Sequence, residues 1–69
     1  MTDLKITLAA ARVNAGYTQD DVAKALHVGK KTVGNWEKGK VTPSFVALTA
    51  LSNLYKMPID NIFLPKQSS

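Results

Sequence analysis

The sequence has no cysteine, a single histidine and no long hydrophobic run. Without cysteine there are no disulfides or thiolate metal sites, and one imidazole among scattered acids cannot form a metal cage. No apolar stretch approaches the roughly 20 residues of a membrane span, and charges interrupt the N-terminal segment where a signal peptide would be apolar. The composition therefore predicts a cytoplasmic protein with no metal, no cofactor and no small-molecule ligand, whose core is held by packing alone.

Side chains that could carry out catalysis are also sparse. Ser44 and Ser52 lack the organised histidine and acid of a catalytic triad. The stretch from Gly34 to Lys40 has the G-x-x-x-x-G-K spacing of a phosphate-binding loop, but Val41 stands where that loop has Ser or Thr. No predicted strand precedes it, and 69 residues are too few for a nucleotide-binding α/β domain. We therefore expect that the protein is not an enzyme.

Acidic residues are few, 5 against 9 basic ones, and the positive excess is confined to one stretch. Residues 24–40 carry a net charge of +4, whereas 1–23 carry −1 and 41–69 carry +1. The stretch contains one acid, Glu37, and five lysines: Lys24, Lys30, Lys31, Lys38 and Lys40. A basic stretch in a protein of pI about 9.6 suits nucleic-acid binding. From charge alone, a solvated lysine-rich face explains it as well.

Apolar residues at helical spacing predict three helices in the first half of the chain. The first ends at Gly16, which suits a left-handed helix cap. Thr18 and Asp21 resemble a capping box, weakened because Asp is shorter than the usual Glu, at the start of the second helix. The third ends at Gly39, again in a cap position. The predicted helices cover about 4–15, 19–26 and 30–38.

The second half of the chain predicts one longer helix and one short helix. Apolar and polar residues do not alternate there over a stretch long enough for a strand. Pro43 suits the first turn of a helix over about 43–55, because proline has no N–H to satisfy there. Pro58 interrupts the helical pattern, and Ile62 with Phe63 is assigned to a short fifth helix. Five residues of the longer predicted helix fall on one face of it: Phe45, Leu48, Leu51, Ser52 and Tyr55. We therefore expect one all-α domain over 1–69, with a frayed tail over 65–69.

The order helix, three-residue turn, helix over about 18–39 is that of a helix-turn-helix unit. In such units the N-terminal residues of the second helix meet base edges in the major groove, and here they are Lys30, Lys31 and Thr32. Asn35 follows one turn later on the same side. Lysine can donate to guanine, and Asn can pair with adenine through two hydrogen bonds. The exposed face of the predicted recognition helix is thus equipped to read sequence.

The sequence resembles the phage repressor and Cro type of helix-turn-helix regulators, also called the xenobiotic-response-element family. The resemblance runs from Leu8 to Phe63 and rests on several short motifs in a fixed order. They are AR at 11–12, GYTQ at 16–19, VA at 22–23, LHV at 26–28, TVGNWEKG at 32–39, Pro43, and MPIDNIF at 57–63. Each motif is weak alone, but together in this order they are specific.

The resemblance implies roles for individual residues. Thr18 and Gln19 are expected to contact DNA phosphates. Lys38 and Lys40 are also expected to contact phosphates, because of their positive charge rather than the resemblance. The resemblance implies that Lys30, Lys31 and Asn35 contact bases, and Thr32 is added from its place at the start of the recognition helix. Arg12 and Glu37 are expected to form an internal ion pair between the first and third helices, although two unrelated exposed charges are the alternative.

The sequence departs from the family pattern in the turn and in the recognition helix. His27 occupies a turn position that commonly carries Gly, and His is among the more tolerant residues if positive φ is needed there. Gly29 and Gly34 stand where the family often has Ser. Gly34 in a helix interior costs about 1 kcal/mol relative to Ala. It either permits close approach of the backbone to DNA or is a tolerated weakness, and the sequence leaves both open.

These features predict a sequence-specific transcriptional regulator that binds duplex DNA. One short helix reads only a few base pairs, so we expect a homodimer on a near-palindromic operator. The alternative is an antitoxin or protein-binding module on the same scaffold, with an apolar contact surface formed by Val46, Leu54, Ile59 and Leu64. The same residues could form the homodimer contact or be scattered exposed apolar residues.

Overall fold

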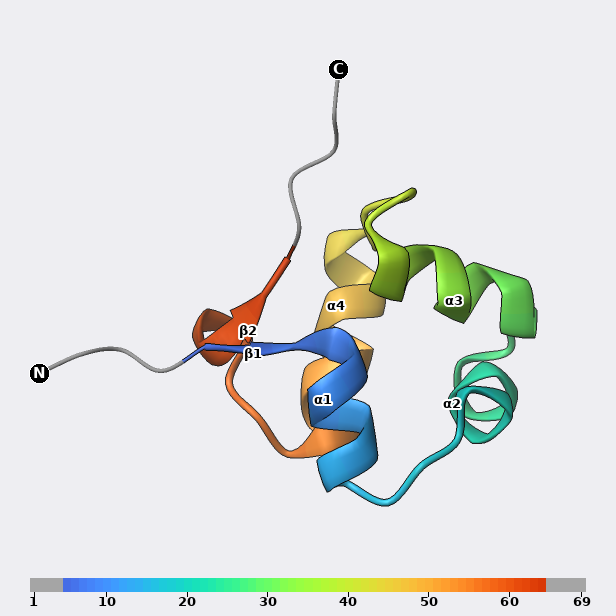
Figure 1. Cartoon of the computed structure of the whole chain (residues 1–69). Helices are drawn as coiled ribbons and strands as arrows, with labels where there is room; N and C mark the ends of the chain where they lie inside the picture. Colours follow the sequence, from blue (N-terminus) through green and yellow to red (C-terminus); the bar gives the residue numbers. More distant parts are fainter. Residues whose placement is uncertain (1–4, 65–69) are drawn as a thin grey trace, which may run out of the picture.

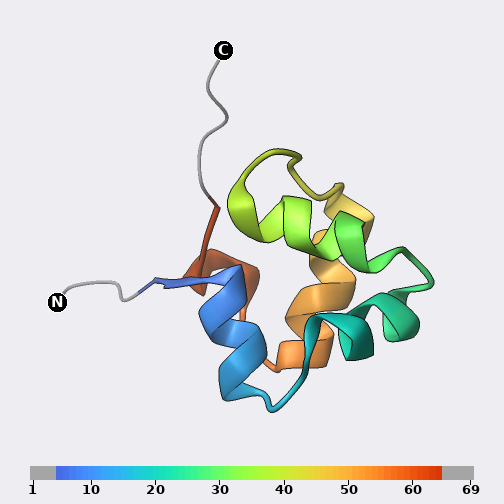
Figure 2. The ribbon, with the colours of Figure 1, turned by 45° about the vertical axis from the view of Figure 1, so that its right-hand side comes forward.

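The structure, a computed structural model, describes residues 5–64. Its elements in chain order are β1 Ile6–Thr7, α1 Leu8–Asn14, α2 Gln19–Leu26, α3 Lys30–Lys38, α4 Phe45–Tyr55, the 3₁₀ turn η1 Ile59–Asn61, and β2 Ile62–Phe63. Figure 1 and Figure 2 place the strand pair beside α1, at the end of the molecule away from α2. The fold is therefore a compact group of helices closed at one end by two short strands.

All four α-helices and β2 contribute to the hydrophobic core. Among residues 5–64, the buried side chains that form this core are those of Leu8, Ala11, Val22, Ala23, Val33, Trp36, Leu48, Leu51, Tyr55 and Ile62. Val22, Val33 and Leu51 are almost completely buried, with exposed fractions of 1% or less. Val33 and Trp36, three residues apart on the third helix, both belong to this core. The core thus anchors α3 from behind and leaves its opposite face to solvent.

The predicted bounds of the second and third helices are confirmed by α2 and α3. The capping box that begins α2 is present: the Thr18 hydroxyl accepts a hydrogen bond from the Asp21 N–H, and the Asp21 carboxylate accepts one from the Thr18 N–H. His27 ends α2 with φ of 58°, so this turn position does need the left-handed conformation that His tolerates better than most residues. Local signals therefore define the ends of the helix-turn-helix unit.

The first and fourth helices begin later than predicted. The hydroxyl of Thr7 accepts a hydrogen bond from the backbone three residues on, so α1 begins at Leu8, and residue 4 lies outside the described range. Ser44 caps α4 in the same way, so Pro43 is not in its first turn but buried ahead of it. Phe45 then becomes the first helical residue and is 76% exposed, whereas Leu48, Leu51 and Tyr55, assigned to the same face, are buried.

The prediction of a fifth helix and of no strands is wrong. η1 is a single 3₁₀ turn, and Ile62 and Phe63 continue from it as β2. β2 pairs in parallel with β1, with Ile6 opposite Ile62 and Thr7 opposite Phe63. The pairing joins segments from opposite ends of the chain, so no local alternation of apolar and polar residues predicts it. The predicted tail over 65–69 lies outside the described residues.

Candidate nucleic-acid interface

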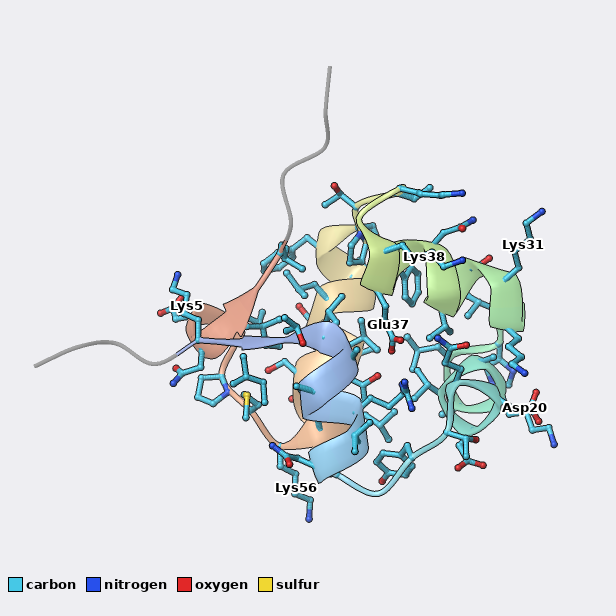
Figure 3. The ribbon with its side chains drawn as sticks, viewed as in Figure 1. Lys5, Asp20, Lys31, Glu37, Lys38 and Lys56 are labelled. Carbon is cyan, nitrogen blue, oxygen red and sulfur yellow. The ribbon has the colours of Figure 1, made fainter. Side chains whose placement is uncertain are left out.

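The outer face of α3 carries the side chains predicted to meet bases. Lys30 and Lys31 are exposed, and Thr32 and Asn35 are partly exposed, whereas Val33 is buried beneath them. In Figure 3, Lys31 and Lys38 project outward from α3, while Lys5 and Lys56 lie on other parts of the molecule. The helix thus separates a core face from a polar, basic face.

The N-terminus of α3 is unusually positive. Its N-cap is Gly29, which provides no side-chain hydrogen bond, and its first turn contains no acid. Lys30 and Lys31 add two charges at the end where the helix dipole is already positive. This placement disfavours the free helix and favours an anionic partner.

The structure brings six of the eight predicted DNA-contacting residues around one shallow surface depression, which we name the basic hollow. Its lining consists of Gln19, Lys30, Lys31, Gly34, Asn35, Lys38 and Lys40. Thr18 and Thr32 are not part of that lining. The hollow combines four ammonium groups with two amides, which are donors and acceptors suited to phosphates and base edges.

Glu37, the acid of α3, points away from the basic face toward α1 (Figure 3). The Nε of Arg12 donates to its Oε2 at 2.7 Å, and the Nη2 of Arg12 donates to its Oε1 at 3.3 Å. The two side chains are only 15% and 8% exposed. The hydrogen bond with Glu37 raises the pKa of Arg12 against an opposing effect of burial. The ion pair expected from the resemblance is therefore present, and it keeps the one negative charge of α3 off the basic face of the helix.

Gln19 also binds Glu37, a contact that sequence reasoning missed. Its Nε2 donates to Glu37 Oε1 at 2.9 Å, so one carboxylate links α1, α2 and α3. Arg12 further donates through Nη1 to the backbone oxygen of Tyr17 at 3.0 Å. No sequence signal pairs Gln19 with Glu37, because the two lie on different helices. The network ties the start of α2 to the C-terminal part of α3.

Two acids in the first turn of α2 limit how strongly that end attracts phosphate. Asp21 is committed to the capping box, and the hydrogen bond from the Thr18 backbone N–H lowers the pKa of its carboxyl below the ordinary value. Asp20 lies 3.3 Å from the ammonium of Lys24, four residues on, and both side chains are largely exposed. Such a pair contributes little to stability but offsets part of the charge of Lys24.

Within residues 5–64, no group of three or more histidine, aspartate or glutamate side chains is placed to hold a metal ion. Over the same residues, no helix is long and apolar enough to cross a membrane.

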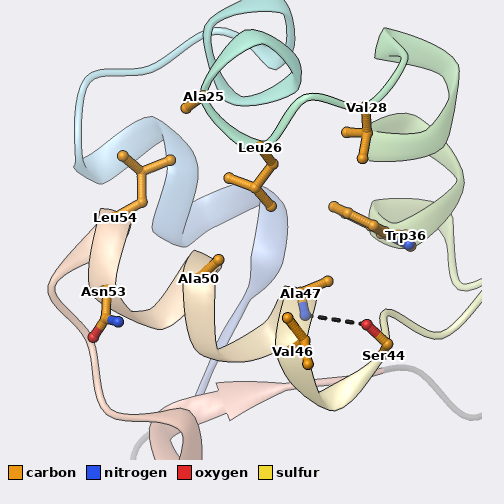
Figure 4. A pocket seen from close by; sticks show the side chains of 10 residues that line it. All are labelled: Ala25, Leu26, Val28, Trp36, Ser44, Val46, Ala47, Ala50, Asn53 and Leu54. Atoms are coloured by element: carbon orange, nitrogen blue, oxygen red, sulfur yellow. Dashed lines mark hydrogen bonds between the residues drawn. The ribbon is translucent and has the colours of Figure 1, made fainter.

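A second surface feature is an apolar groove between the end of α2, the turn after it, and α4 (Figure 4). Its lining includes Leu26, Val28, Trp36, Val46, Ala50 and Leu54. Val46 is 79% exposed at its edge. The apolar surface expected from sequence is therefore only partly correct, because Val46 and Leu54 line this groove but Ile59 and Leu64 do not.

Two curated proteins match this chain over most of its length. The HTH-type transcriptional regulator ImmR of Bacillus subtilis (strain 168) is 40% identical over 53 residues, which are 77% of this chain and 42% of ImmR. The HTH-type transcriptional activator BcrR of Enterococcus faecalis is 29% identical over 55 residues, which are 80% of this chain and 27% of BcrR. The chain thus spans less than half the length of either relative.

A family model described as helix-turn-helix matches residues 8–62, most of the chain. The match includes the Arg12–Glu37 pair, α2, the turn and α3. The chain therefore belongs to the helix-turn-helix family, as its resemblance to regulators of the xenobiotic-response-element type indicated.

Proposed function

We propose that this chain is a sequence-specific DNA-binding unit of a transcriptional regulator, with α3 lying in the major groove. The observation that carries the proposal is the basic hollow, in which lysines and amides from α2 and α3 share one face while Glu37 is neutralised beneath it. The matched relatives bear the names of transcriptional regulators. Phosphate attraction supplies affinity in such units, and contacts to base edges supply specificity.

The residues that meet bases are Lys30, Lys31, Thr32 and Asn35. Their exposure at the start and middle of α3 supports this role, since the N-terminal half of a recognition helix enters the groove. Lysine ammonium groups suit guanine O6 and N7, whereas the Asn35 amide suits adenine N6 and N7.

The residues that meet phosphates are Thr18, Lys38 and Lys40. Lys38 and Lys40 border the hollow near the end of α3, where the DNA backbone would flank the groove. The Thr18 oxygen already accepts the capping hydrogen bond, but its hydroxyl proton can still be donated to a phosphate oxygen.

Selection of bound sequences from random duplex DNA tests the proposed function. The wild-type chain should enrich one short sequence, and footprinting should map the protected phosphates to the two edges of a major groove. A Lys30→Ala, Lys31→Ala double variant should lose this enrichment, whereas Lys5→Ala, on another part of the molecule, should retain it. Failure of the wild-type chain to enrich any sequence would refute the proposal.

The apolar groove favours a second candidate function, a module that binds another protein. A groove of this kind suits the apolar face of an amphipathic helix. In that case the product of a neighbouring gene, such as a toxin, should co-purify with the chain. Val46→Glu should abolish that complex, and Lys31→Ala should leave it intact. DNA binding that survives Val46→Glu with no such complex would favour the first function.

A further inference from the structure

The amide of Gln19 lies directly beside the bare backbone of Gly34 in the basic hollow. A Cβ atom built on Gly34 would lie 3.9 Å from Nε2 and 3.9 Å from Oε1 of Gln19. Since these are the nearest atoms to that position, the polar edge of the amide, rather than its aliphatic stem, borders the space left by the missing side chain. Gln19 comes from α2, yet it occupies the recognition face of α3.

Glu37 determines which way round this amide is held. A buried carboxylate accepts hydrogen bonds only, so the nitrogen of Gln19 must face it, and Nε2 donates to Oε1 of Glu37 at 2.9 Å. Reversing the amide would place two oxygens against each other beside a side chain that is only 8% exposed. The bond uses one hydrogen of Nε2, and the amide retains its second hydrogen and its oxygen for another partner.

We propose that Gln19 reads the edge of a base, and that Gly34 is the opening through which the base reaches it. This inference rests on the proposed DNA-binding function. An amide that offers an oxygen acceptor beside an N–H donor matches adenine, whose N6 donates and whose N7 accepts in the major groove. The base pair read by Gln19 is therefore an A·T pair with the adenine facing α2.

The orientation of the amide argues against the phosphate contact that the family resemblance implies for Gln19. Phosphate oxygens only accept hydrogen bonds, so a phosphate could use the remaining N–H of Gln19 but would leave its Oε1 without a donor. The fixed orientation matches an edge that both donates and accepts. It also gives Gly34 a function: a larger side chain there would fill the space that the base edge must enter.

The test compares sequences selected from random duplex DNA by the wild-type chain, Gln19→Met and Gly34→Leu. Gln19→Met keeps the length of the side chain but removes both polar atoms. Gly34→Leu keeps both Gln19 and Glu37, because a Cβ at this position meets the Gln19 amide at an ordinary contact distance of 3.9 Å, and the rest of the leucine side chain should cover the opening. Asn53→Met, which removes an exposed amide on α4 outside the hollow, is the matched control.

Both variants should relax the same position of the site, where the wild-type preference for A·T of about 5- to 150-fold should fall to about 1-fold. The control should keep the wild-type site. Circular dichroism and the fluorescence of buried Trp36 establish that each variant is folded before its selection is read.

Base analogues then identify the atoms involved. Purine in place of adenine removes the N6 amine, and 7-deazaadenine removes the N7 acceptor. Each analogue should weaken binding of the wild-type chain at that position and have no effect on binding of Gln19→Met. Such coupling is expected only if the amide and the base edge touch.

Other outcomes overturn the inference. A uniform loss of affinity across sequences in folded Gln19→Met would assign the amide to a phosphate or to scaffolding. Relaxation of different positions by the two variants, or an unchanged site, would show that Gly34 is not the opening to Gln19. If the wild-type chain enriches no sequence, the proposed function fails as well, whereas a defined site that is insensitive to Gln19 refutes only this inference.

Discussion

At the scale of single residues, Glu37 does more than balance a charge. It accepts hydrogen bonds from Arg12 on α1 and Gln19 on α2 while sitting on α3 itself. A carboxylate with these donors cannot move without disturbing two other helices. The side chains on the opposite face of α3 are thereby presented from a fixed backbone, which base readout requires.

Asn35→Ala should reduce specificity at a single base pair. The side chain lines the basic hollow and is partly exposed, so its amide can reach a base edge from the middle of α3. Loss of its two hydrogen bonds should cost about 1 to 3 kcal/mol on the preferred sequence and much less on sequences altered at that pair. Competition titrations on the selected site and its single-base variants measure this. An equal loss on every sequence would exclude a base-reading role.

Ionisation of Tyr55 should lower the free energy of unfolding at alkaline pH. Burial of its ring raises its pKa to about 12, and the nearby charge of Glu37 acts in the same direction against that of Arg12. Because the pKa is raised in the folded state, stability is fully present below the unfolded value of about 10 and falls as the pH rises toward 12. The loss is at most about 3 kcal/mol, and less where solvent reaches the hydroxyl.

Urea titrations at a series of pH values from 9 to about 11.5 measure this effect. Tyr55→Phe, which has no ionisable group, should show a flatter dependence than the wild-type chain over the same interval. Equal slopes for the two proteins would show that Tyr55 is not the responsible group.

At the scale of helices and strands, the elements with local end signals were the predictable ones. α2 has a capping box at Thr18 and a left-handed residue at His27, and α3 ends at Gly39 with φ of 79°. Sequence also anticipated the Arg12–Glu37 pair, through resemblance rather than spacing. Except for Arg12 on α1, these features lie in the helix-turn-helix unit, so most of the candidate site was predictable.

The features that sequence missed depend on distant contacts or on a choice between adjacent residues. The parallel strands join Ile6 to Ile62, and their pairing has no signature within either segment. Pro43 and Ser44 can each begin a helix, and the structure uses Ser44 as the cap. Gln19 meets Glu37 only because α2 packs on α3, which spacing along the chain does not reveal.

The link between α1 and α3 yields a prediction about paired substitutions. Arg12→Met would leave a carboxylate that is 92% buried with Gln19 as its remaining donor, and Glu37→Leu would leave a guanidinium that is 85% buried. Each single change should cost about 3 kcal/mol or more, a large fraction of the roughly 5 kcal/mol expected of so small a domain. The double variant should recover much of the loss, because neither charge then remains buried.

Urea midpoints followed by the fluorescence of buried Trp36 test this cycle. Additive losses, or single variants within about 0.5 kcal/mol of wild type, would mean that the pair does not couple the helices. DNA affinity measured on the stable double variant then shows whether the pair also positions α3.

At the scale of the whole molecule, charge is distributed unevenly. Four lysines border the basic hollow, while Lys5 and Lys56 lie on other parts of the surface (Figure 3). Lys40→Ala should weaken binding to all sequences alike and reduce the slope of log affinity against log salt by about 0.9, the release of one counterion. Lys5→Ala removes the same charge away from the hollow and should leave the slope nearly unchanged. Equal slopes for wild type and Lys40→Ala would exclude a phosphate contact.

The size of the recognition surface leads to a prediction about the operator. α3 has nine residues, and only its exposed side chains can meet bases, so one copy reads too few base pairs to specify a site in a genome. Two copies related by a two-fold axis would double the site, and their recognition helices would enter successive major grooves on one face of the DNA. The selected site should therefore be a near-palindrome with half-site centres about 10 base pairs apart.

Insertions of base pairs between the half-sites distinguish paired binding by two copies from independent binding by each copy. Adding about 5 base pairs turns one half-site to the opposite face of the duplex, so a paired complex should lose at least about 10-fold in affinity and fall to the level of a single half-site. Replacing the same central bases without changing the spacing is the matched control and should have a much smaller effect. If the insertion leaves affinity unchanged, or if selection returns one asymmetric half-site, each copy binds alone, and the specificity of the protein must then come from the hollow of a single chain.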